Sequence, residues 1–234
     1  MSIEGSITAL VTPMNEKGDL DYNSLEKLIN FQIDSGISGL VAVGTTGESA
    51  TIDFEDHIKL IEFFIKISNG RVHIIAGTGA NSTEEALHLT KEAKNLGADA
   101  ALLVSPYYNK PPQEGIYRHH AKIADEVDIP QILYNVPSRT ASFIEPKTVQ
   151  RLSSHQNIMG IKDATGDMKN LSEVIKLCEE NIKSKNFFDL KTFIGMKTIK
   201  KYFRYKFNEK NKLFDQLKLS SLHCFLNYTA FLFF

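Results

Sequence analysis

Short β-branched runs alternate with longer amphipathic segments over the first two-thirds of the chain, and this alternation restricts its possible folds more than any other feature. The amphipathic segments carry apolar residues at spacings of three and four, for example Leu25, Leu28 and Ile29. Strands that alternate with helices build parallel sheets, because neighbouring parallel strands need a long crossover connection. The sequence therefore predicts an α/β fold.

Six strands are expected, each followed by a helix. The predicted strands are residues 6–11, 39–43, 72–76, 100–104, 131–135 and 158–161. Asp21 and Ser82 are predicted helix N-caps, and Glu85 follows Ser82 at the spacing of a capping box. No Gly-rich phosphate fingerprint follows the first strand, so the even βα rhythm favours a (β/α)8 TIM barrel over a doubly wound sheet.

The composition of the chain changes after about residue 181. Residues 182–234 hold 10 of the 15 phenylalanines and 10 lysines, but no proline and one glycine. No seventh or eighth strand bounded by turns is identified there. We therefore expect an incomplete barrel with six clear βα units in residues 1–181 and an atypical Lys/Phe-rich tail in residues 182–234. The tail is compatible with a genuine extension, a divergent end or translation in a shifted frame.

Charge and composition exclude several classes of function. The net charge of -1 and the lack of a long basic run give no electrostatic reason for nucleic-acid or membrane binding. Two cysteines, Cys178 and Cys224, make neither a disulfide framework nor a metal site, which favours a reducing compartment. The N-terminus lacks signal-peptide features, and no apolar run reaches the roughly 20 residues of a membrane helix. We expect a cytoplasmic protein without a metal.

Lys162 lies in the apolar run IMGIKDATGDM, which is short enough to be one buried strand. Burial removes water from the amine, disfavours its ammonium form and lowers the pKa, which leaves some nucleophilic amine near neutral pH. An amine of this kind can form a Schiff base with a carbonyl substrate. An isolated lysine is more often a strand-end residue that reaches water. The motifs upstream favour the catalytic interpretation.

Unusual polar residues follow the predicted strands, where a barrel forms its active site. They are Thr12, Thr45, Thr46, and residues 77–81, 105–109, 134–139 and 162–165. Because the carboxyl ends of the strands meet at one edge of a barrel, these residues are expected to converge on one site.

Two of these segments carry groups suited to a carbonyl reaction. In LYNVPSRT, the Tyr134 hydroxyl could pass protons and the Arg139 guanidinium could bind a carboxylate. Alternatively, Tyr134 is a core aromatic residue and Arg139 a surface residue. In GTTGES, Thr45 and Thr46 offer hydroxyl and N–H groups to a carboxylate, although a simple βα turn explains the glycines equally well.

A third segment, SPYYNKPP, places Tyr107 and Tyr108 in a proline-rich loop. Paired aromatic residues on a loop are more often packing or interface groups than catalysts. The interface interpretation is therefore favoured.

Taken together, GTTGES, SPYYNKPPQEG, YNVPSRT and GIKDATGD resemble, in order and spacing, the dihydrodipicolinate synthase family of Schiff-base lyases over about residues 1–181. The resemblance implies condensation of pyruvate with aspartate semialdehyde in the diaminopimelate pathway of lysine biosynthesis, without a cofactor. It implies that Lys162 forms an imine with pyruvate and that Thr46, Tyr134 and Tyr108 form a proton relay. Thr45, Thr46 and Arg139 would bind the substrate carboxylates.

The resemblance also implies assembly and regulation. Family members are commonly homotetramers built from tight dimers, in which Tyr108 would reach into the neighbouring subunit. Many members are inhibited by lysine, and Phe54 stands where regulated members often carry a histidine. The positions that match the regulatory site are Ser49, Ala50, His57, Asn81, Glu85 and Tyr107.

The chain departs from the family pattern after residue 181. Family members continue with a Ser-Gly-Asp-Asp loop and two further strands, which are not found in residues 182–234. A parallel barrel without two strands exposes two sheet edges, so low stability or loss of activity is expected. A sister Schiff-base 2-keto acid aldolase, or a truncated non-catalytic homologue, therefore remains as an alternative.

Overall fold

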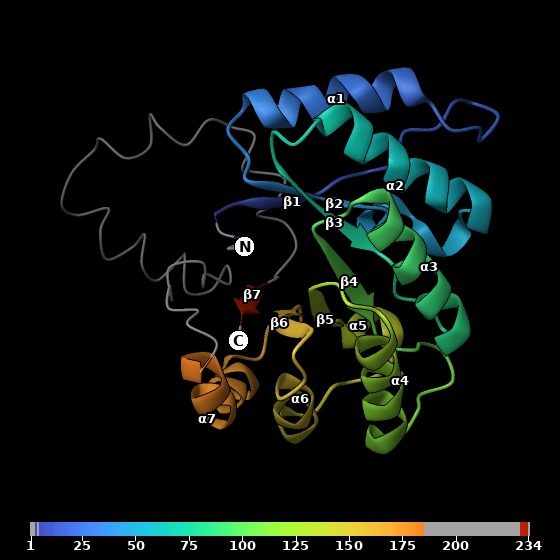
Figure 1. Ribbon diagram of the computed structural model, residues 1–234. Helices are drawn as coiled ribbons and strands as arrows, with labels where there is room; N and C mark the ends of the chain where they lie inside the picture. Colours follow the sequence, from blue (N-terminus) through green and yellow to red (C-terminus); the bar gives the residue numbers. More distant parts are fainter. Residues whose placement is uncertain (1–2, 4, 185–229, 234) are drawn as a thin grey trace, which may run out of the picture.

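The computed structural model describes residues 3, 5–184 and 230–233, and its main feature is a curved sheet of parallel strands (Figure 1). The strands lie in chain order, and each pairs in parallel with the next. Their bounds are β1 Ile7–Ala9, β2 Gly39–Ala42, β3 His73–Gly77, β4 Ala100–Val104, β5 Gln131–Asn135 and β6 Ile158–Asp163. These six strands confirm the predicted six βα units, and β6 continues two residues further than expected.

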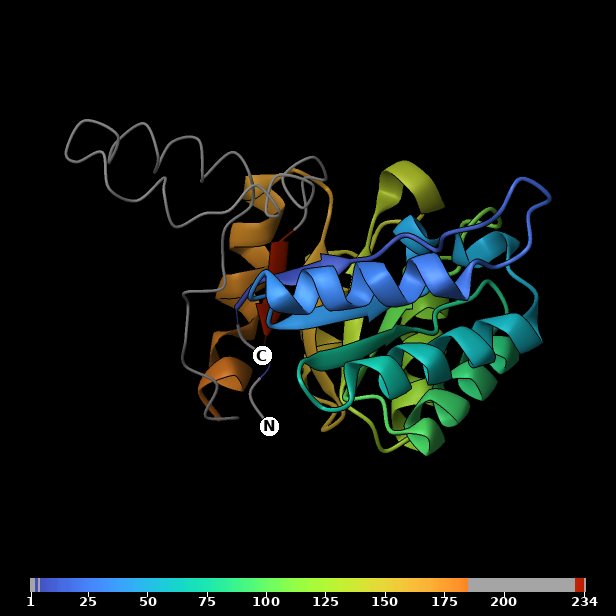
Figure 2. The ribbon, with the colours of Figure 1, turned by 90° about the horizontal axis from the view of Figure 1, so that it is seen from above.

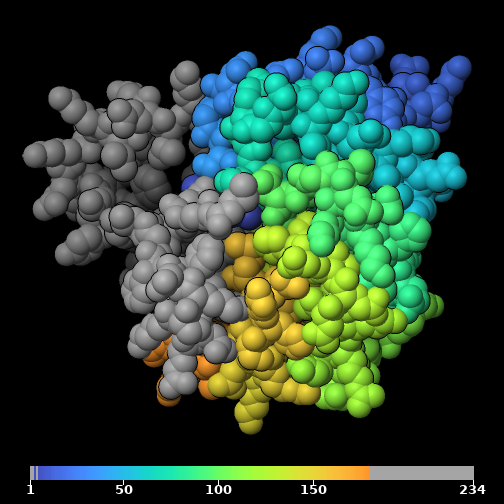
Figure 3. All heavy atoms as spheres, viewed as in Figure 1, coloured from blue at the N-terminus to red at the C-terminus, as the bar shows by residue number. Residues whose placement is uncertain are grey.

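Helices cover the outer face of the sheet, as Figure 1 and the view from above in Figure 2 show. They are α1 Tyr22–Asp34, α2 Phe54–Ser68, α3 Thr83–Leu96, α4 Gln113–Glu126, α6 Pro146–Ser153 and α7 Met168–Ser184, while the single turn α5 Pro137–Thr140 lies directly after β5. In the space-filling view of Figure 3, consecutive segments lie side by side on the surface in the order of their colours.

Two of the helices begin where the sequence predicts. The carboxylate of Asp21 accepts a hydrogen bond from the Ser24 N–H at 3.0 Å and caps α1. The hydroxyl of Ser82 accepts from the Glu85 N–H at 3.4 Å and caps α3. Both side chains satisfy N–H groups that the first helical turn leaves without a partner. The predicted N-caps are therefore confirmed.

The core has two layers because strand side chains alternate between the faces of the sheet. One layer packs between sheet and helices, where Leu40 and Ile74 join Ile29 of α1 and Phe64 of α2. The other layer fills the concave side of the sheet with Ile7, Val41, Ile75, Leu102, Ile132, Tyr134 and Met159. The concave layer therefore reaches the strand ends at which the site residues lie.

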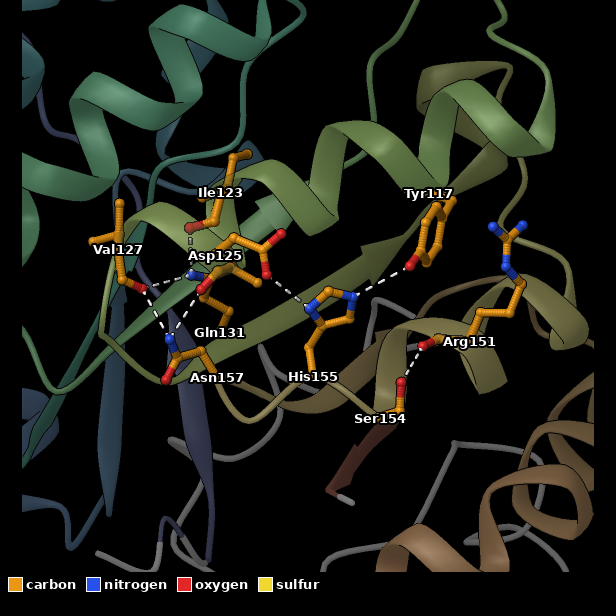
Figure 4. Close-up of polar contacts among 10 residues, drawn as sticks. Tyr117, Ile123, Asp125, Val127, Gln131, Arg151, Ser154, His155 and Asn157 are labelled. Carbon is orange, nitrogen blue, oxygen red and sulfur yellow. Dashed lines mark hydrogen bonds and ion pairs between the residues drawn. The ribbon is translucent and has the colours of Figure 1, made fainter.

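Side-chain amides hold the C-terminal end of α4 at the amino ends of β5 and β6 (Figure 4). Gln131 Nε2 donates to the carbonyls of Ile123 and Val127, both at 3.2 Å. Asn157 Nδ2 donates to the Val127 carbonyl at 3.3 Å and to the Ala124 carbonyl at 2.9 Å. The carbonyls of Ile123 and Val127 also accept backbone N–H groups, so the bond to the Ala124 carbonyl is the one that serves an acceptor of the last helical turn. The side-chain amide bonds fix α4 against the first residues of β5 and β6.

Aromatic and charged side chains join α4 to α6 beside these amides (Figure 4). The Arg151 guanidinium lies 3.8 Å from the centroid of the Tyr117 ring, and His155 Nδ1 lies 3.2 Å from an Asp125 carboxylate oxygen. A cation over an aromatic face contributes about 1 kcal/mol at an exposed site. This cluster lies in the helix layer, on the other side of the sheet from its concave face.

A seventh strand, β7 Ala230–Phe233, pairs antiparallel with β6. From the sequence, no strand is expected in this part of the chain, and that expectation is wrong for these four residues. The outer edge of β6 offers backbone N–H and C=O groups that another segment can pair. Most of the predicted tail at 182–234, namely residues 185–229 and 234, lies outside the described residues.

Within residues 3, 5–184 and 230–233, no helix combines the length and the hydropathy that a membrane crossing requires.

Candidate active site

Lys162 and Tyr134 lie side by side at the carboxyl ends of β6 and β5, where they are register partners. The Lys162 Nζ atom lies 4.4 Å from the centroid of the Tyr134 ring. Each side chain is only 7% exposed. The structure therefore brings a buried amine against a buried phenol, as the two motifs predict.

A register irregularity in β6 turns Lys162 toward the concave side. Gln131 pairs with Ile158, but the next residue of β5, Ile132, pairs with Gly160, so β6 has one extra residue there. An extra residue in one strand reverses which face the following side chains occupy. Without it, strict alternation from Ile158, which packs against the helices, would turn Lys162 toward the helix layer as well.

The Tyr134 hydroxyl is influenced by Thr45 and Arg139. Burial raises the pKa of Tyr134, while a hydrogen bond with the Thr45 side chain and the positive charge of Arg139 oppose this increase. A phenol keeps its proton at neutral pH, and the contacts with Thr45 and Arg139 limit the loss of acidity that burial causes. Arg139 is exposed and lies on the single turn α5 directly after β5.

The GTTGES segment forms two consecutive 3₁₀ turns, η1 Thr45–Gly47 and η2 Ser49–Thr51. The Thr12 hydroxyl donates to the Gly47 carbonyl at 2.7 Å, so the loops after β1 and β2 are joined. A Cβ on Gly47 would lie 3.0 Å from the Thr12 hydroxyl oxygen. Thr45 and Thr46 are half-buried in η1, and the hydroxyl that reaches Tyr134 is that of Thr45.

Val43, just before this segment, has an unusual backbone conformation. Its φ is 51° and its side chain is fully buried. A β-branched residue at positive φ is strained, and such strain persists only where packing enforces it. A Cβ on Gly77 would lie 2.4 Å from the Val43 carbonyl oxygen, so the end of β3 must be glycine for the two backbones to meet. This contact determines where the η1 turn begins.

The SPYYNKP loop after β4 separates its two tyrosines. Tyr107 is half-buried, whereas Tyr108 is 87% exposed and has φ of 68°. The Tyr108 N–H donates to the Thr140 carbonyl at 3.3 Å, and the Ser142 hydroxyl donates to the Pro106 carbonyl at 2.8 Å. The loop is therefore held to the segment after β5, while the Tyr108 side chain projects away from the rest of the chain that the structure describes.

Two residues within the expected segments 134–139 and 162–165, to which the sequence assigns no role of their own, lie directly behind this site. Asn135 follows Tyr134 and Asp163 follows Lys162, and they too are register partners. Asn135 Nδ2 donates to Asp163 Oδ2 at 3.3 Å, and both residues are buried. Burial raises the pKa of the Asp163 carboxyl, and hydrogen bonds from Thr165 and Asn135 oppose this shift. Their positions beside two reactive residues are the signal that could have identified them.

The six positions that match a regulatory site lie in three neighbouring βα units: Ser49 and Ala50 in η2, His57 in α2, Asn81 before α3, Glu85 in α3 and Tyr107 after β4. His57 Nε2 lies 2.7 Å from the Gly77 carbonyl oxygen, and burial lowers its pKa. The Asn81 Oδ1 atom is buried without a hydrogen-bond partner. The ring of Phe54 packs edge-on against His88 at 4.9 Å.

No metal-binding arrangement is found in the part of the chain that the structure describes, because no three His, Cys, Asp or Glu side chains there cluster as ligands.

Comparison with known proteins gives consistent results. A family model described as the dihydrodipicolinate synthetase family matches residues 2–190. The chain is 57% identical over 179 residues to a 4-hydroxy-tetrahydrodipicolinate synthase of Thermodesulfovibrio yellowstonii, covering 76% of this chain and 61% of that protein. It is 58% identical over 173 residues to a Pseudomonas putida protein of the same name, covering 74% and 59%. The chain therefore spans about three-fifths of the length of these relatives.

Solved structures show the same similarity. A dihydrodipicolinate synthase of Acinetobacter baumannii, described as chloride-inhibited and complexed with pyruvate, superposes with a TM-score of 0.75 at 53% identity. The match covers 77% of this chain and 62% of that one. The Aquifex aeolicus enzyme gives a TM-score of 0.72 at 51% identity, covering 74% and 59%.

Proposed function

The chain belongs to the dihydrodipicolinate synthetase family, and we propose that it condenses pyruvate with aspartate semialdehyde through a Schiff base on Lys162. The observation that carries the proposal is the contact between the buried Lys162 amine and the Tyr134 ring at 4.4 Å. The Acinetobacter baumannii relative is described as a complex with pyruvate, which supports pyruvate as the first substrate. The product would enter the diaminopimelate pathway in the cytoplasm.

The first half-reaction needs an amine and a proton donor close together. Lys162 would attack the ketone carbon of pyruvate, and the resulting hydroxyl group would leave as water after it accepts a proton. Tyr134 is suited to donate that proton, because a phenol is protonated at neutral pH and its ring contacts Lys162. Loss of a methyl proton then gives the enamine that attacks the aldehyde.

The resemblance gives the relay to Thr46 and carboxylate binding to Thr45, but the contacts favour a different distribution. The hydrogen bond to Tyr134 comes from Thr45. We therefore assign the relay position to Thr45 and pyruvate-carboxylate binding mainly to Thr46, which is the next residue of the same 3₁₀ turn. Thr45 can bind the carboxylate through its N–H group at the same time, since its hydroxyl is then free to move protons.

Arg139 would bind the carboxylate of aspartate semialdehyde. Its guanidinium is exposed on α5, immediately after the strand that holds Tyr134, and its charge influences the Tyr134 hydroxyl. A guanidinium binds a carboxylate through two parallel hydrogen bonds, which fixes the orientation of the substrate.

Tyr108 would complete the relay from a second copy of the chain. Its side chain is 87% exposed and its backbone is held at positive φ, which supports a role beyond its own subunit. Assembly into dimers follows from this proposal, and assembly of dimers into tetramers is proposed from the resemblance to the family. Lysine inhibition would act at Ser49, Ala50, His57, Asn81, Glu85 and Tyr107.

The substrate pair is tested by incubating the purified chain with isotope-labelled pyruvate and a panel of aldehydes. Product formation followed by NMR should be fastest with aspartate semialdehyde. A preference for another aldehyde would identify a sister 2-keto acid aldolase. No product with any aldehyde would favour the non-catalytic homologue, which trapping of the pyruvate imine with borohydride tests separately.

A further inference from the structure

The second pair of register partners, Asn135 and Asp163, lies on the opposite face of the strands from Tyr134 and Lys162. Successive strand residues point to opposite faces, so each reactive residue has a polar neighbour on the helix side. Asn135 is 1% exposed and Asp163 is 4% exposed. Buried polar groups of this kind require hydrogen-bond partners, and their arrangement can therefore be followed bond by bond.

Asn135 closes the loop that carries Arg139. Its Oδ1 accepts from the Ile144 N–H at 3.1 Å, and its Nδ2 donates to the Ile144 carbonyl at 3.3 Å. These paired bonds join the two ends of the segment 136–143, which includes α5 and Arg139. The backbone carbonyl of Asn135 also accepts from the Ala164 N–H at 2.8 Å, just after β6.

Asp163 holds the turn that follows Lys162. One carboxylate oxygen accepts from the Thr165 N–H at 3.0 Å and from the Thr165 hydroxyl at 2.5 Å. The other oxygen accepts from Asn135 Nδ2 at 3.3 Å. Three donors directed at one buried carboxylate favour its ionised form, in which it is a strong acceptor.

We propose that Asn135 and Asp163 are positioning residues that set the Arg139 loop relative to Lys162 and thereby select the second, carboxylate-bearing substrate. The pair is the connection between the loop that would hold that carboxylate and the strand that would hold the imine. Pyruvate needs only groups on the strands and on η1, so its binding depends less on the pair. The identity of the second substrate rests on the proposed function, whereas the hydrogen bonds of the pair do not depend on it.

Exchange of the two side chains tests the pair. Asn135→Asp places two carboxylates against each other, Asp163→Asn places two amides there, and the double variant restores one of each. We expect each single variant to raise the KM for aspartate semialdehyde about tenfold, as loss of a charge-assisted hydrogen bond predicts, with little change in the rate of pyruvate trapping. The double variant should recover part of that loss, because it restores the bond between the two side chains but not the donation to the Ile144 carbonyl.

Asn157→Asp is the matched control, because Asn157 also donates to backbone carbonyls but at the opposite end of β6. It should lower stability without changing the KM for the aldehyde. The proposal is overturned if the single variants raise both KM values and slow trapping equally, if they change neither, or if the double variant is no better than the singles.

Amide hydrogen exchange provides a readout that needs no turnover. Exchange at Ile144 and Thr165 should accelerate in both single variants and slow again in the double variant. Unchanged amide exchange at Ile144 and Thr165 in the single variants would show that the pair does not hold these two segments. Absence of a pyruvate adduct in the unmodified chain, with the exchange pattern as expected, would instead overturn the proposed reaction and leave the hydrogen-bonded pair intact.

Discussion

Lys162 and Tyr134 pair in register on β6 and β5, and the amine lies 4.4 Å from the centre of the phenol ring. This relationship depends on the register irregularity at the start of β6, because the extra residue turns Lys162 to the concave face. The site is therefore created by a local departure from regular strand geometry in an otherwise regular sheet.

Tyr134→Phe should slow formation of the pyruvate imine on the order of 100-fold, because it removes a positioned proton donor and keeps the ring. The measurement is the rate at which a borohydride-reducible adduct accumulates. Tyr117→Phe is the control, since it removes a hydroxyl of α4 that contacts His155 just after α6, in the helix layer and not beside Lys162. Equal rates in Tyr134→Phe and the unmodified chain would contradict the role of the hydroxyl.

Thr45→Val and Thr46→Val should have different effects. The hydrogen bond from Thr45 lowers the pKa of Tyr134, so Thr45→Val should raise that pKa further and lower kcat. Thr46→Val should mainly raise the KM for pyruvate. An ultraviolet titration of tyrosine ionisation, combined with steady-state kinetics, checks both expectations. If only Thr46→Val lowered kcat, the relay position would belong to Thr46 and not to Thr45.

Stability should fall as the pH decreases from about 6.5 to 4, because of His119. Burial lowers the pKa of His119 to about 4, with Thr83 at 2.8 Å from one ring nitrogen and the His120 ring beside it. In this range the unfolded chain binds a proton that the folded chain does not, so protons favour unfolding. The shift corresponds to on the order of 3 kcal/mol of stability at pH 7.

Urea unfolding at several pH values measures this dependence. His119→Gln should reduce the loss of stability between pH 7 and pH 5, because glutamine does not titrate. His88→Gln is the control, since the His88 side chain is 59% exposed. The account of His119 fails if both variants lose stability with pH as the unmodified chain does.

Gly77→Ala should destabilise the chain by about 2 to 4 kcal/mol and slow imine formation, because its Cβ would overlap the Val43 carbonyl beside η1. Gly36→Ala should lower the free energy of unfolding by only about 1 kcal/mol, because φ is 82° there but nothing lies within 4 Å of the added Cβ. Thermal unfolding and adduct formation measure the two effects. A Gly77→Ala variant with normal adduct formation would show that the Val43 contact does not position η1.

The fold of the first 184 residues could be predicted because strand and helix periodicities differ and caps have simple side-chain signals. Lys162 and Tyr134 were identified because motif chemistry and strand position agree. The choice between Thr45 and Thr46 could not be made, since neighbouring side chains in a 3₁₀ turn diverge by about 120° and the sequence does not set the rotation.

Other features depend on contacts between distant segments. The Asn135–Asp163 bond can be predicted only when the register between β5 and β6 is known. The face on which Lys162 lies depends on the register irregularity near Gly160. The antiparallel pairing of β7 with β6 depends on which edge remains open, and periodicity carries no information about that. Positive φ at Val43 contradicts the preference of valine and follows from packing.

The most direct test of the central claim is reduction of the purified chain with borohydride in the presence of pyruvate, followed by mass measurement of the peptide that contains Lys162. The account predicts that this peptide gains the mass of pyruvate less water plus two hydrogens, and that Lys162→Arg abolishes the gain. A folded chain that acquires no adduct, or acquires it on another lysine, would contradict the account.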